Sequence, residues 1–217
     1  DMFGRTYSWK TRNVVVSTGF YDSPRLLGIP GEDLPHVAHY YTEAHAYADH
    51  DVLIIGAGSS AAEVALELYR EHARVTVAMR EQRFQTKYWV EPDIENRIAE
   101  GSITCHRGVE VVAIRPDEVE LESHEGERIV VPTEFVLAMT GFEPDTSILE
   151  AAGAVVDKES GKPRLTEAYE TTVPGMYVAG TLCAGKDANV VFIENGREHG
   201  PKIVADIVAR RKDGATS

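Results

Sequence analysis

The sequence predicts an α/β fold with a mostly parallel sheet, and three observations lead to this fold class. Residues 52–55, "VLII", form a continuous apolar run of the kind found in parallel strands that are buried on both faces. Residues 59–71 follow with apolar positions at helical spacing, and residues 74–79, "RVTVAM", form a second strand-like run. A strand, a helix and a strand in this order predict a βαβ unit with a right-handed crossover.

Composition limits the classes of protein that fit. The chain has 217 residues, of which 43% are hydrophobic and 26% charged, as expected for one large or two small globular domains. Its net charge of −13 argues against a nucleic-acid partner, because a phosphate backbone attracts basic surfaces. No apolar run approaches the roughly 18 residues that cross a membrane, so no membrane partner is expected. Cys105 and Cys183 form no Cys-x-x-Cys motif, which favours a reducing, cytoplasmic location.

The residues before the βαβ unit are patterned as well. Residues 12–18, "RNVVVST", predict a short buried strand that ends at Gly19. Residues 24–37 are rich in proline and glycine and predict a surface loop. Four histidines follow at spacings that match no standard ligand pattern, so no metal site is predicted: His36, His39, His45 and His50.

The period changes after the βαβ unit. Residues 118–131, "EVELESHEGERIVV", alternate in polarity and predict a hairpin that turns at residues 124–126. Residues 134–142, "EFVLAMTGF", predict another apolar strand, whose Thr-Gly-Phe ending repeats that of residues 13–20, "NVVVSTGF". We interpret this echo as two related domains. Residues 175–185, "GMYVAGTLCAG", predict one more buried strand and a glycine-rich turn.

The last predicted element is a long helix over residues 190–211. Asn189 is suited to be its N-cap, and its two halves are expected to join around Gly200-Pro201. Glu194, Arg197 and His199 are expected on the helix surface. A role as a base is the less favoured interpretation of His199.

The turn after the first strand of the βαβ unit carries the motif Gly56-x-Gly58-x-x-Ala61. Gly56 permits the tight turn, Gly58 leaves room for a pyrophosphate, and the small Ala61 lets the helix pack closely on the strand. Ser59 and Ser60 begin the helix, whose free N–H groups and positive dipole end attract an anion. The motif in this context predicts a dinucleotide site, and a generic strand-helix turn is the alternative.

Basic residues follow the second strand, where the group that distinguishes NADP from NAD is expected. Arg80 stands at the strand end, Arg83 and Lys87 follow it, and Glu81 comes one residue late for a ribose-binding acid. A base at this position binds a 2′-phosphate, so we predict NADP(H) rather than NAD(H). The alternative is that these are solvated loop charges.

Four longer stretches resemble a known family. They are "VVVSTGFYDSPRLLGIPGEDLPHV", "KYWVEPDIENRIAEGSI", "FVLAMTGFEPD" and "ANVVFIENGREHG". The sequence resembles two-dinucleotide FAD/NAD(P)H flavoproteins of the thioredoxin-reductase type, and among them the bacillithiol-disulfide-reductase family. The resemblance implies a Rossmann-like NADP-binding domain inserted into an incomplete FAD-binding domain, with a three-layer, mostly parallel sheet. Residues 1–48 and 143–217 would belong to the FAD domain and residues 49–142 to the NADP(H) domain.

The resemblance also implies roles for residues outside the glycine motif. Ser17, Thr18 and Gly19 would pass beside the FAD, and Thr140 and Gly141 beside the nicotinamide nucleotide. Gly180 and the helix start at Ala188 and Asn189 would lie at the flavin ring and its ribityl-phosphate arm. Thr181 stands where many relatives carry an Asp that holds the flavin chain, and its hydroxyl can still donate a hydrogen bond.

One part of the family pattern is missing. Proteins of this type begin with their own glycine motif for FAD, and none occurs here, so the chain is expected to be N-terminally truncated. The family's proposed redox cysteine belongs to that part, so no catalytic residue is assigned. Cys183 would lie near the flavin, where a helix N-terminus would lower its pKa. The favoured interpretation is a small buried residue, and Cys105 is expected to be structural. An uncovered sheet edge would favour a homo-oligomer.

The resemblance implies an NADPH-dependent flavoprotein oxidoreductase that reduces a small-molecule, low-molecular-weight disulfide. FAD binding is expected for the complete protein rather than for this chain alone. Two alternatives stay open. One is an NADP(H)-binding module without flavin or catalysis, and the other is a flavoprotein reductase with another acceptor, such as ferredoxin.

Overall fold

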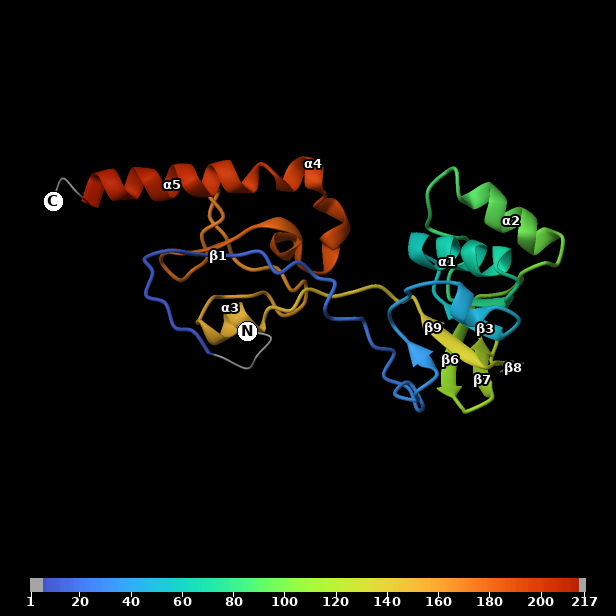
Figure 1. Cartoon of the computed structure of the whole chain (residues 1–217). Coiled ribbons are helices and arrows are strands. Elements are labelled where there is room, and N and C mark those ends of the chain that lie inside the picture. The colour runs from blue at the N-terminus through green and yellow to red at the C-terminus, as the bar shows by residue number, and fades with distance from the viewer. Residues whose placement is uncertain (1–5, 215–217) are drawn as a thin grey trace. The chain divides into compact units, whose positions relative to one another are not determined.

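The computed structural model describes residues 6–214, except the side chains of residues 188, 189, 213 and 214. The chain divides into two compact units (Figure 1). We call residues 24–141 the central unit, and residues 1–23 together with 142–217 the flanking unit. The sequence-based division placed the first boundary after residue 48, whereas the compact units meet after Ser23.

Long-range strand pairing explains this difference. Strand β2 (Val37–Ala38) pairs in parallel with β9 (Phe135–Ala138), almost a hundred residues later in the chain. Ile29 and Leu34 also pack against buried residues of the central unit. A two-residue strand inside a proline-rich loop has no recognisable sequence period, so residues 24–48 could not be assigned to this unit beforehand.

The centre of this unit is a five-stranded parallel sheet with the order β2-β9-β3-β4-β5. Strands β3 (Asp51–Ile55) and β4 (Arg74–Met79) are neighbours and are connected through helix α1 (Ser59–Arg70). The predicted βαβ unit is therefore confirmed. Strand β5 (Thr104–Arg107) forms the far edge, and the short helix η1 (His45–Tyr47) precedes β3.

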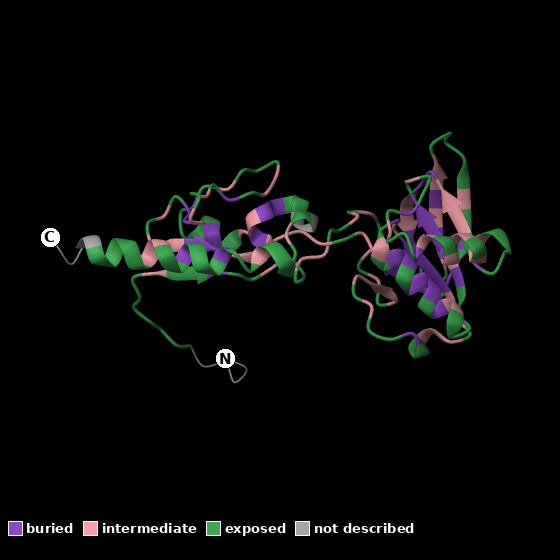
Figure 2. Ribbon diagram, turned by 90° about the horizontal axis from the view of Figure 1, so that it is seen from above, coloured by how far each residue is buried: buried purple, intermediate pink, exposed green. Residues whose placement is uncertain are grey.

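The sheet is the middle of three layers. Val52 and Ile54 of β3 pack in one cluster with α1 and α2 (Glu91–Ala99). Leu53 and Ile55 point to the other face, because successive side chains of a strand alternate. There they meet an antiparallel sheet of β6 (Val109–Ile114), β7 (Glu118–Ser123) and β8 (Arg128–Pro132). The hairpin predicted at residues 118–131 is confirmed as β7 and β8, and β6 extends it. The buried residues follow the strands and the inner face of α1 (Figure 2).

The flanking unit is built around two parallel strands, β1 (Val14–Val16) and β10 (Met176–Val178). Helix α3 (Ser147–Ala151) contributes Leu149 to a small core with Val16 and Val178. The prediction that β1 is buried is only partly correct. Val14 and Val15 are 44% and 48% exposed, because within the described residues β1 pairs with β10 alone.

The C-terminal part differs from the single kinked helix that the sequence predicts. After the 3₁₀ turns of η2 (Gly180–Val190), helix α4 (Ile193–Gly196) is short, and α5 (His199–Gly214) is a separate helix. The N-cap position of α4 is Phe192, whose N–H donates to Asn195 Oδ1 at 2.8 Å, so Asn189 is not the N-cap. Pro201 lies in the first turn of α5, where a missing N–H is tolerated. The helix is therefore interrupted before Pro201 rather than kinked at it.

Side-chain contacts of Asp206 and Arg210 help to hold α5 against the rest of the flanking unit. The Tyr177 hydroxyl donates to Asp206 at 2.7 Å, and Arg210 forms a bidentate ion pair with the buried Glu170. Among the described residues, none of the helices combines the length and the apolar character that a membrane span requires.

Candidate functional site

The glycine turn of the central unit connects the end of β3 to the start of α1. Gly56 has φ +137°, and a Cβ added to it would lie 2.4 Å from the backbone oxygen of Met139. Only glycine fits there, because the chain passes against the end of β9. A Cβ on Gly58 would meet nothing within 4 Å. Ala61 is fully buried beneath the turn. The turn is therefore closed on the side of β9 and open at Gly58.

Backbone hydrogen bonds fix this turn. Gly56 N–H donates to Ala78 O at 3.0 Å, and Gln85 N–H donates to Ala57 O at 2.7 Å. Helix α1 has Gly58 as its N-cap residue and no side chain that caps its first N–H groups. Ser59, Ser60 and Ala61 therefore present an uncapped helix N-terminus beside the open glycine, an arrangement that suits an anionic group.

The three predicted bases after β4 differ in their surroundings. Arg80 and Arg83 are exposed, and neither guanidinium has a partner among the described residues. Lys87 instead forms an ion pair with Glu63 at 2.8 Å and lies 5.7 Å from the centre of the Trp89 ring. Two unpaired guanidinium groups close to the end of β4 can receive an anion, whereas Lys87 is already engaged.

Arg107, which the sequence analysis did not single out, anchors this loop. Its Nη1 donates to Gln82 O at 2.6 Å, and its Nη2 pairs with Glu95 at 2.8 Å. A Cβ on the neighbouring Gly108 would lie 2.6 Å from Gln82 Nε2. The loop between Arg80 and Arg83 is thus held from β5. A lone arginine at the end of a strand carries no sequence signal for such a role.

Thr140 and Gly141 follow β9, the neighbour of β3 in the sheet. The Thr140 hydroxyl donates to Arg25 O at 2.6 Å, and Arg25 N–H donates to Gly141 O at 2.9 Å. Gly141 adopts φ +89°. The carboxyl ends of β3, β4 and β9 therefore gather the glycine turn, Arg80 and Thr140 at one edge of a parallel sheet, where ligands of such folds bind.

The flanking unit gathers a second group of predicted residues. Val16 pairs with Val178, and Ala179 N–H donates to Val16 O at 2.9 Å, so β1 and β10 end together. Ser17 and Thr18 are exposed just beyond β1. A Cβ on Gly19 would lie 3.8 Å from Thr181 Oγ1, which brings the turn after β1 to the turn after β10. The side chains of Ala188 and Asn189 lie outside the described part of the structure.

His199 is buried rather than exposed, contrary to the expectation for the last helix. Only 6% of its surface is accessible, and its ring stacks on Tyr169 with centroids 4.1 Å apart. Gly180 N–H donates to its Nδ1 at 3.1 Å. Burial lowers the pKa of His199, and the positive charge of Lys202 lowers it further. The sequence gives no hint of this, because the contacts span up to thirty residues.

Cys183 is a half-buried thiol beside His199. Its Sγ donates to Val178 O at 3.4 Å and lies 3.7 Å from His199 Nδ1. Burial raises the pKa of Cys183 to about 11, so the lowered pKa considered for this residue is wrong. Burial also raises the pKa of Cys105 to about 11, and both cysteines are free. Neither thiol has the environment of a reactive cysteine.

Three of the four histidines of this stretch contact different groups. His36 Nε2 is 3.1 Å from Arg115 O, His39 contacts Glu32, and His50 contacts Glu134. Among the described residues, no three His, Cys, Asp or Glu side chains are grouped to hold a metal ion.

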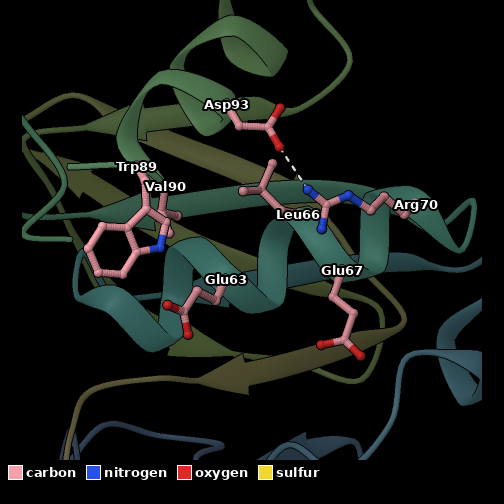
Figure 3. Close-up of a pocket in the computed structure, with 7 residues that line it drawn as sticks. All are labelled: Glu63, Leu66, Glu67, Arg70, Trp89, Val90 and Asp93. Atoms are coloured by element: carbon pink, nitrogen blue, oxygen red, sulfur yellow. Dashed lines mark hydrogen bonds and ion pairs between the residues drawn. The ribbon is translucent and has the colours of Figure 1, made fainter. Parts of the chain in front are cut away.

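A pocket of about 340 Å³ lies between α1 and α2 (Figure 3). Leu66, Val90 and Trp89 supply its apolar surface, and Arg70 is paired with Asp93 at 2.7 Å. Glu63 and Glu67 also line it, and none of the predicted site residues does. Three carboxylates against one guanidinium would repel phosphate groups, so this pocket does not suit a dinucleotide.

Comparisons with known proteins give a consistent result. The family model described as pyridine nucleotide-disulphide oxidoreductase matches residues 5–180. The bacilliredoxin reductase Bdr of Bacillus subtilis is 43% identical over 206 residues, which are 94% of this chain and 64% of that protein. The solved structure of the bacillithiol disulfide reductase Bdr from Bacillus cereus superposes with a TM-score of 0.87 at 41% identity, over 91% of this chain and 62% of that one.

A structure with lower sequence identity resembles this chain in its fold alone. The thioredoxin reductase of T. acidophilum superposes with a TM-score of 0.71 at 19% identity, over 90% of this chain and 66% of that one. This chain therefore spans a little under two thirds of the length of the two Bdr proteins that it matches. The α/β fold with a mostly parallel sheet that the sequence predicts is therefore confirmed.

Proposed function

Because this chain belongs to the pyridine nucleotide-disulphide oxidoreductase family, we propose that its central unit binds NADP(H). We propose further that the whole protein is an NADPH-dependent FAD flavoprotein that reduces a low-molecular-weight disulfide. The two unpaired guanidinium groups of Arg80 and Arg83 beside the open glycine turn carry the nucleotide assignment.

Charge supports NADP(H) over NAD(H). A 2′-phosphate carries up to two negative charges, and a bound phosphate is favoured where guanidinium groups have no other anion to neutralise. Arg80 and Arg83 meet this condition, whereas Lys87 already neutralises Glu63. The uncapped N-terminus of α1, beside the space at Gly58, accommodates the pyrophosphate.

We propose that the flanking unit supplies part of an FAD site. Its residues fit a dinucleotide because the turns after β1 and β10 meet at the carboxyl ends of two parallel strands. Ser17 to Gly19 would border the flavin nucleotide on one side and Gly180 with Thr181 on the other. The Thr181 hydroxyl would donate where an acidic residue is common. Thr140 and Gly141 of the central unit would border the nicotinamide nucleotide.

The contribution of the protein to catalysis is placement. The nicotinamide and flavin groups, when bound, supply the hydride and electron transfer. Gly56 and Gly58 shape the turn that binds the pyrophosphate, and Arg80 and Arg83 select the 2′-phosphate. Cys183 remains protonated at neutral pH because burial raises its pKa to about 11, so we assign it no part in disulfide exchange.

The identity of the electron acceptor is the part of this proposal that depends most on the names of the relatives. One relative is named for bacilliredoxin, a protein, and another for bacillithiol disulfide, a small molecule. We propose the small-molecule disulfide for the whole protein. The free thiols of Cys105 and Cys183 suit a reducing compartment such as the cytoplasm.

Calorimetric titration with NADPH and NADH tests the nucleotide assignment. We expect the chain to prefer NADPH and the Arg80→Ala variant to lose about tenfold in NADPH affinity, with little change for NADH. Arg128→Ala is the matched control, because Arg128 is exposed on β8 and pairs with Glu120 and Glu122. Equal losses for both nucleotides in Arg80→Ala would contradict the assignment.

A second candidate follows from the organisation of the chain. The central unit has two buried clusters of its own, one on each face of its sheet, and within the described residues these clusters include only members of the central unit. Such a unit can bind NADP(H) without flavin or turnover. A flavin absorbance band in the purified chain would contradict this module interpretation, whereas a colourless protein that binds NADPH would support it.

A further inference from the structure

The first residue of α5 is buried against the turn that follows β10. His199 is 6% exposed, and its ring is stacked on Tyr169, which adopts a left-handed backbone with φ +65°. On the other side Gly180 N–H approaches Nδ1 at 3.1 Å. The ring therefore lies between a strained loop residue and the first residue of the glycine-rich turn.

This hydrogen bond defines the protonation of the ring. A backbone N–H can only donate, so Nδ1 must carry a lone pair and the proton of the neutral ring must be on Nε2. The nearby thiol of Cys183 does not compete, because it donates to Val178 O at 3.4 Å while its Sγ is 3.7 Å from Nδ1. An imidazolium would direct a second N–H group at Gly180 N–H, and the contact would become repulsive.

The groups that face the ring also favour its neutral form. Tyr169 faces it from the preceding loop and Cys183 from η2. Lys202 on α5 is the charged group beside it, with its Nζ 5.6 Å from the centre of the Tyr169 ring. Among the described residues, no carboxylate forms an ion pair with His199. Desolvation and Lys202 both lower the pKa of His199.

We propose that neutral His199 is a positioning residue, which holds the Gly180–Thr181 turn in place through the Gly180 N–H and releases it when the ring is protonated. Gly180 has φ +75°, and a Cβ on Gly19 would lie 3.8 Å from Thr181 Oγ1. The turn therefore sets where the Thr181 hydroxyl lies relative to the turn after β1. The importance of this position for a flavin nucleotide rests on the proposed function, whereas the positioning itself does not.

Amide exchange of Gly180 measures the positioning directly. In the ¹⁵N-labelled chain we expect the exchange protection of this amide, corrected for intrinsic rate, to fall about tenfold or more between about pH 8 and about pH 5. The Gly56 amide is an internal control, because it donates to the backbone oxygen of Ala78 and should keep its protection. Imidazole ¹⁵N shifts should show the Nε2–H tautomer of His199 at the higher pH.

Two variants separate positioning from simple packing. His199→Asn keeps an acceptor near the place of Nδ1 but cannot be protonated, so Gly180 should stay protected at both pH values. His199→Leu keeps an apolar side chain against Tyr169 and removes the acceptor, so Gly180 should be unprotected at both. Wild-type protection of Gly180 in His199→Leu, or protection independent of pH in the unmodified chain, would overturn the inference.

Flavin titration of the same proteins separates this inference from the proposed function. If the chain binds FAD, its affinity should fall with the protection of Gly180 in His199→Leu and at low pH, and should be retained in His199→Asn. If FAD affinity stays unchanged while Gly180 loses its protection, the importance of this turn for the flavin is overturned, and the positioning by His199 stands. If no protein binds FAD while Gly180 follows the expected pattern, the flavin assignment fails and the positioning by His199 stands.

Discussion

Replacing Gly56 by alanine should damage the fold of the central unit. The new Cβ would lie 2.4 Å from Met139 O and 3.1 Å from its carbonyl carbon, whereas real Cβ atoms stay beyond 3.0 Å. The backbone is also at φ +137°, which side chains rarely adopt. Strain at such a φ costs about 1–3 kcal/mol, and overpacking costs about as much again. We therefore expect Gly56→Ala to lose about 2–6 kcal/mol of the free energy of unfolding, a large share of the usual 5–15 kcal/mol.

Gly58→Ala is the matched variant two residues away. Gly58 has φ −79° and ψ 177°, which any residue adopts, and a Cβ there meets nothing within 4 Å. The free energy of unfolding should change by less than about 1 kcal/mol. The methyl group would, however, occupy the space assigned to the pyrophosphate, so NADPH affinity should fall at least about tenfold.

Urea unfolding followed by circular dichroism gives the stability, and calorimetry gives NADPH affinity. The two variants should separate the two quantities, since Gly56→Ala mainly lowers the free energy of unfolding and Gly58→Ala mainly weakens NADPH binding. A Gly56→Ala protein as stable as the unmodified chain would refute the geometric reasoning about the turn. A Gly58→Ala protein with unchanged NADPH affinity would refute the assignment of the nucleotide to this turn.

Two further predictions concern side chains that already have partners within the protein, Lys87 and Cys183. Lys87→Ala should reduce NADPH affinity less than about threefold in calorimetry, because Lys87 is paired with Glu63, and a loss equal to that of Arg80→Ala would contradict this. Cys183 should react slowly with iodoacetamide at neutral pH, because raising its pKa from 9.0 to about 11 lowers the thiolate fraction about a hundredfold. The rate should rise with pH toward about 11 and should increase at once in denaturant, and rapid alkylation of the folded chain at neutral pH would oppose the prediction.

Local patterns made the centre of the central unit predictable. The apolar run of β3, the helical spacing of α1 and the apolar run of β4 are each contained in a few adjacent residues, and the observed bounds agree within one residue. The glycine motif was equally recognisable, since the tight turn at Gly56 and the close packing of Ala61 follow from residue size, whereas the approach of Gly56 to Met139 after β9 appears only in the structure. The hairpin of β7 and β8 is marked by alternation around a glycine turn.

Features that depend on distant partners were not predictable. β2 exists only because β9 pairs with it, and the burial of His199 depends on Gly180 and on Tyr169. The start of α4 was missed because its capping amide belongs to Asn195, a residue inside the helix rather than ahead of it. In the loop after β4, the sequence shows three equal positive charges, and only the structure distinguishes the paired Lys87 from the unpaired arginines.

The two units use the same arrangement of strand ends but hold it differently. Gly19 and Gly141 follow one strand in each unit, with φ +76° and +89°, and Gly180 and Gly56 follow the parallel neighbour. This agrees with the repeated Thr-Gly-Phe ending in the sequence.

The difference lies in what accepts the first amide of each neighbouring turn. Gly56 N–H bonds to a backbone oxygen of β4, an acceptor that does not titrate in the physiological range. Gly180 N–H bonds to the imidazole of His199, an acceptor that is lost on protonation. Within the described residues β1 and β10 pair only with each other, and a side chain from α5 supplies the acceptor for the Gly180 amide. Lowering the pH should therefore loosen the Gly180 turn of the flanking unit before it affects the Gly56 turn of the central unit. FAD affinity should then fall at a pH at which NADPH still binds.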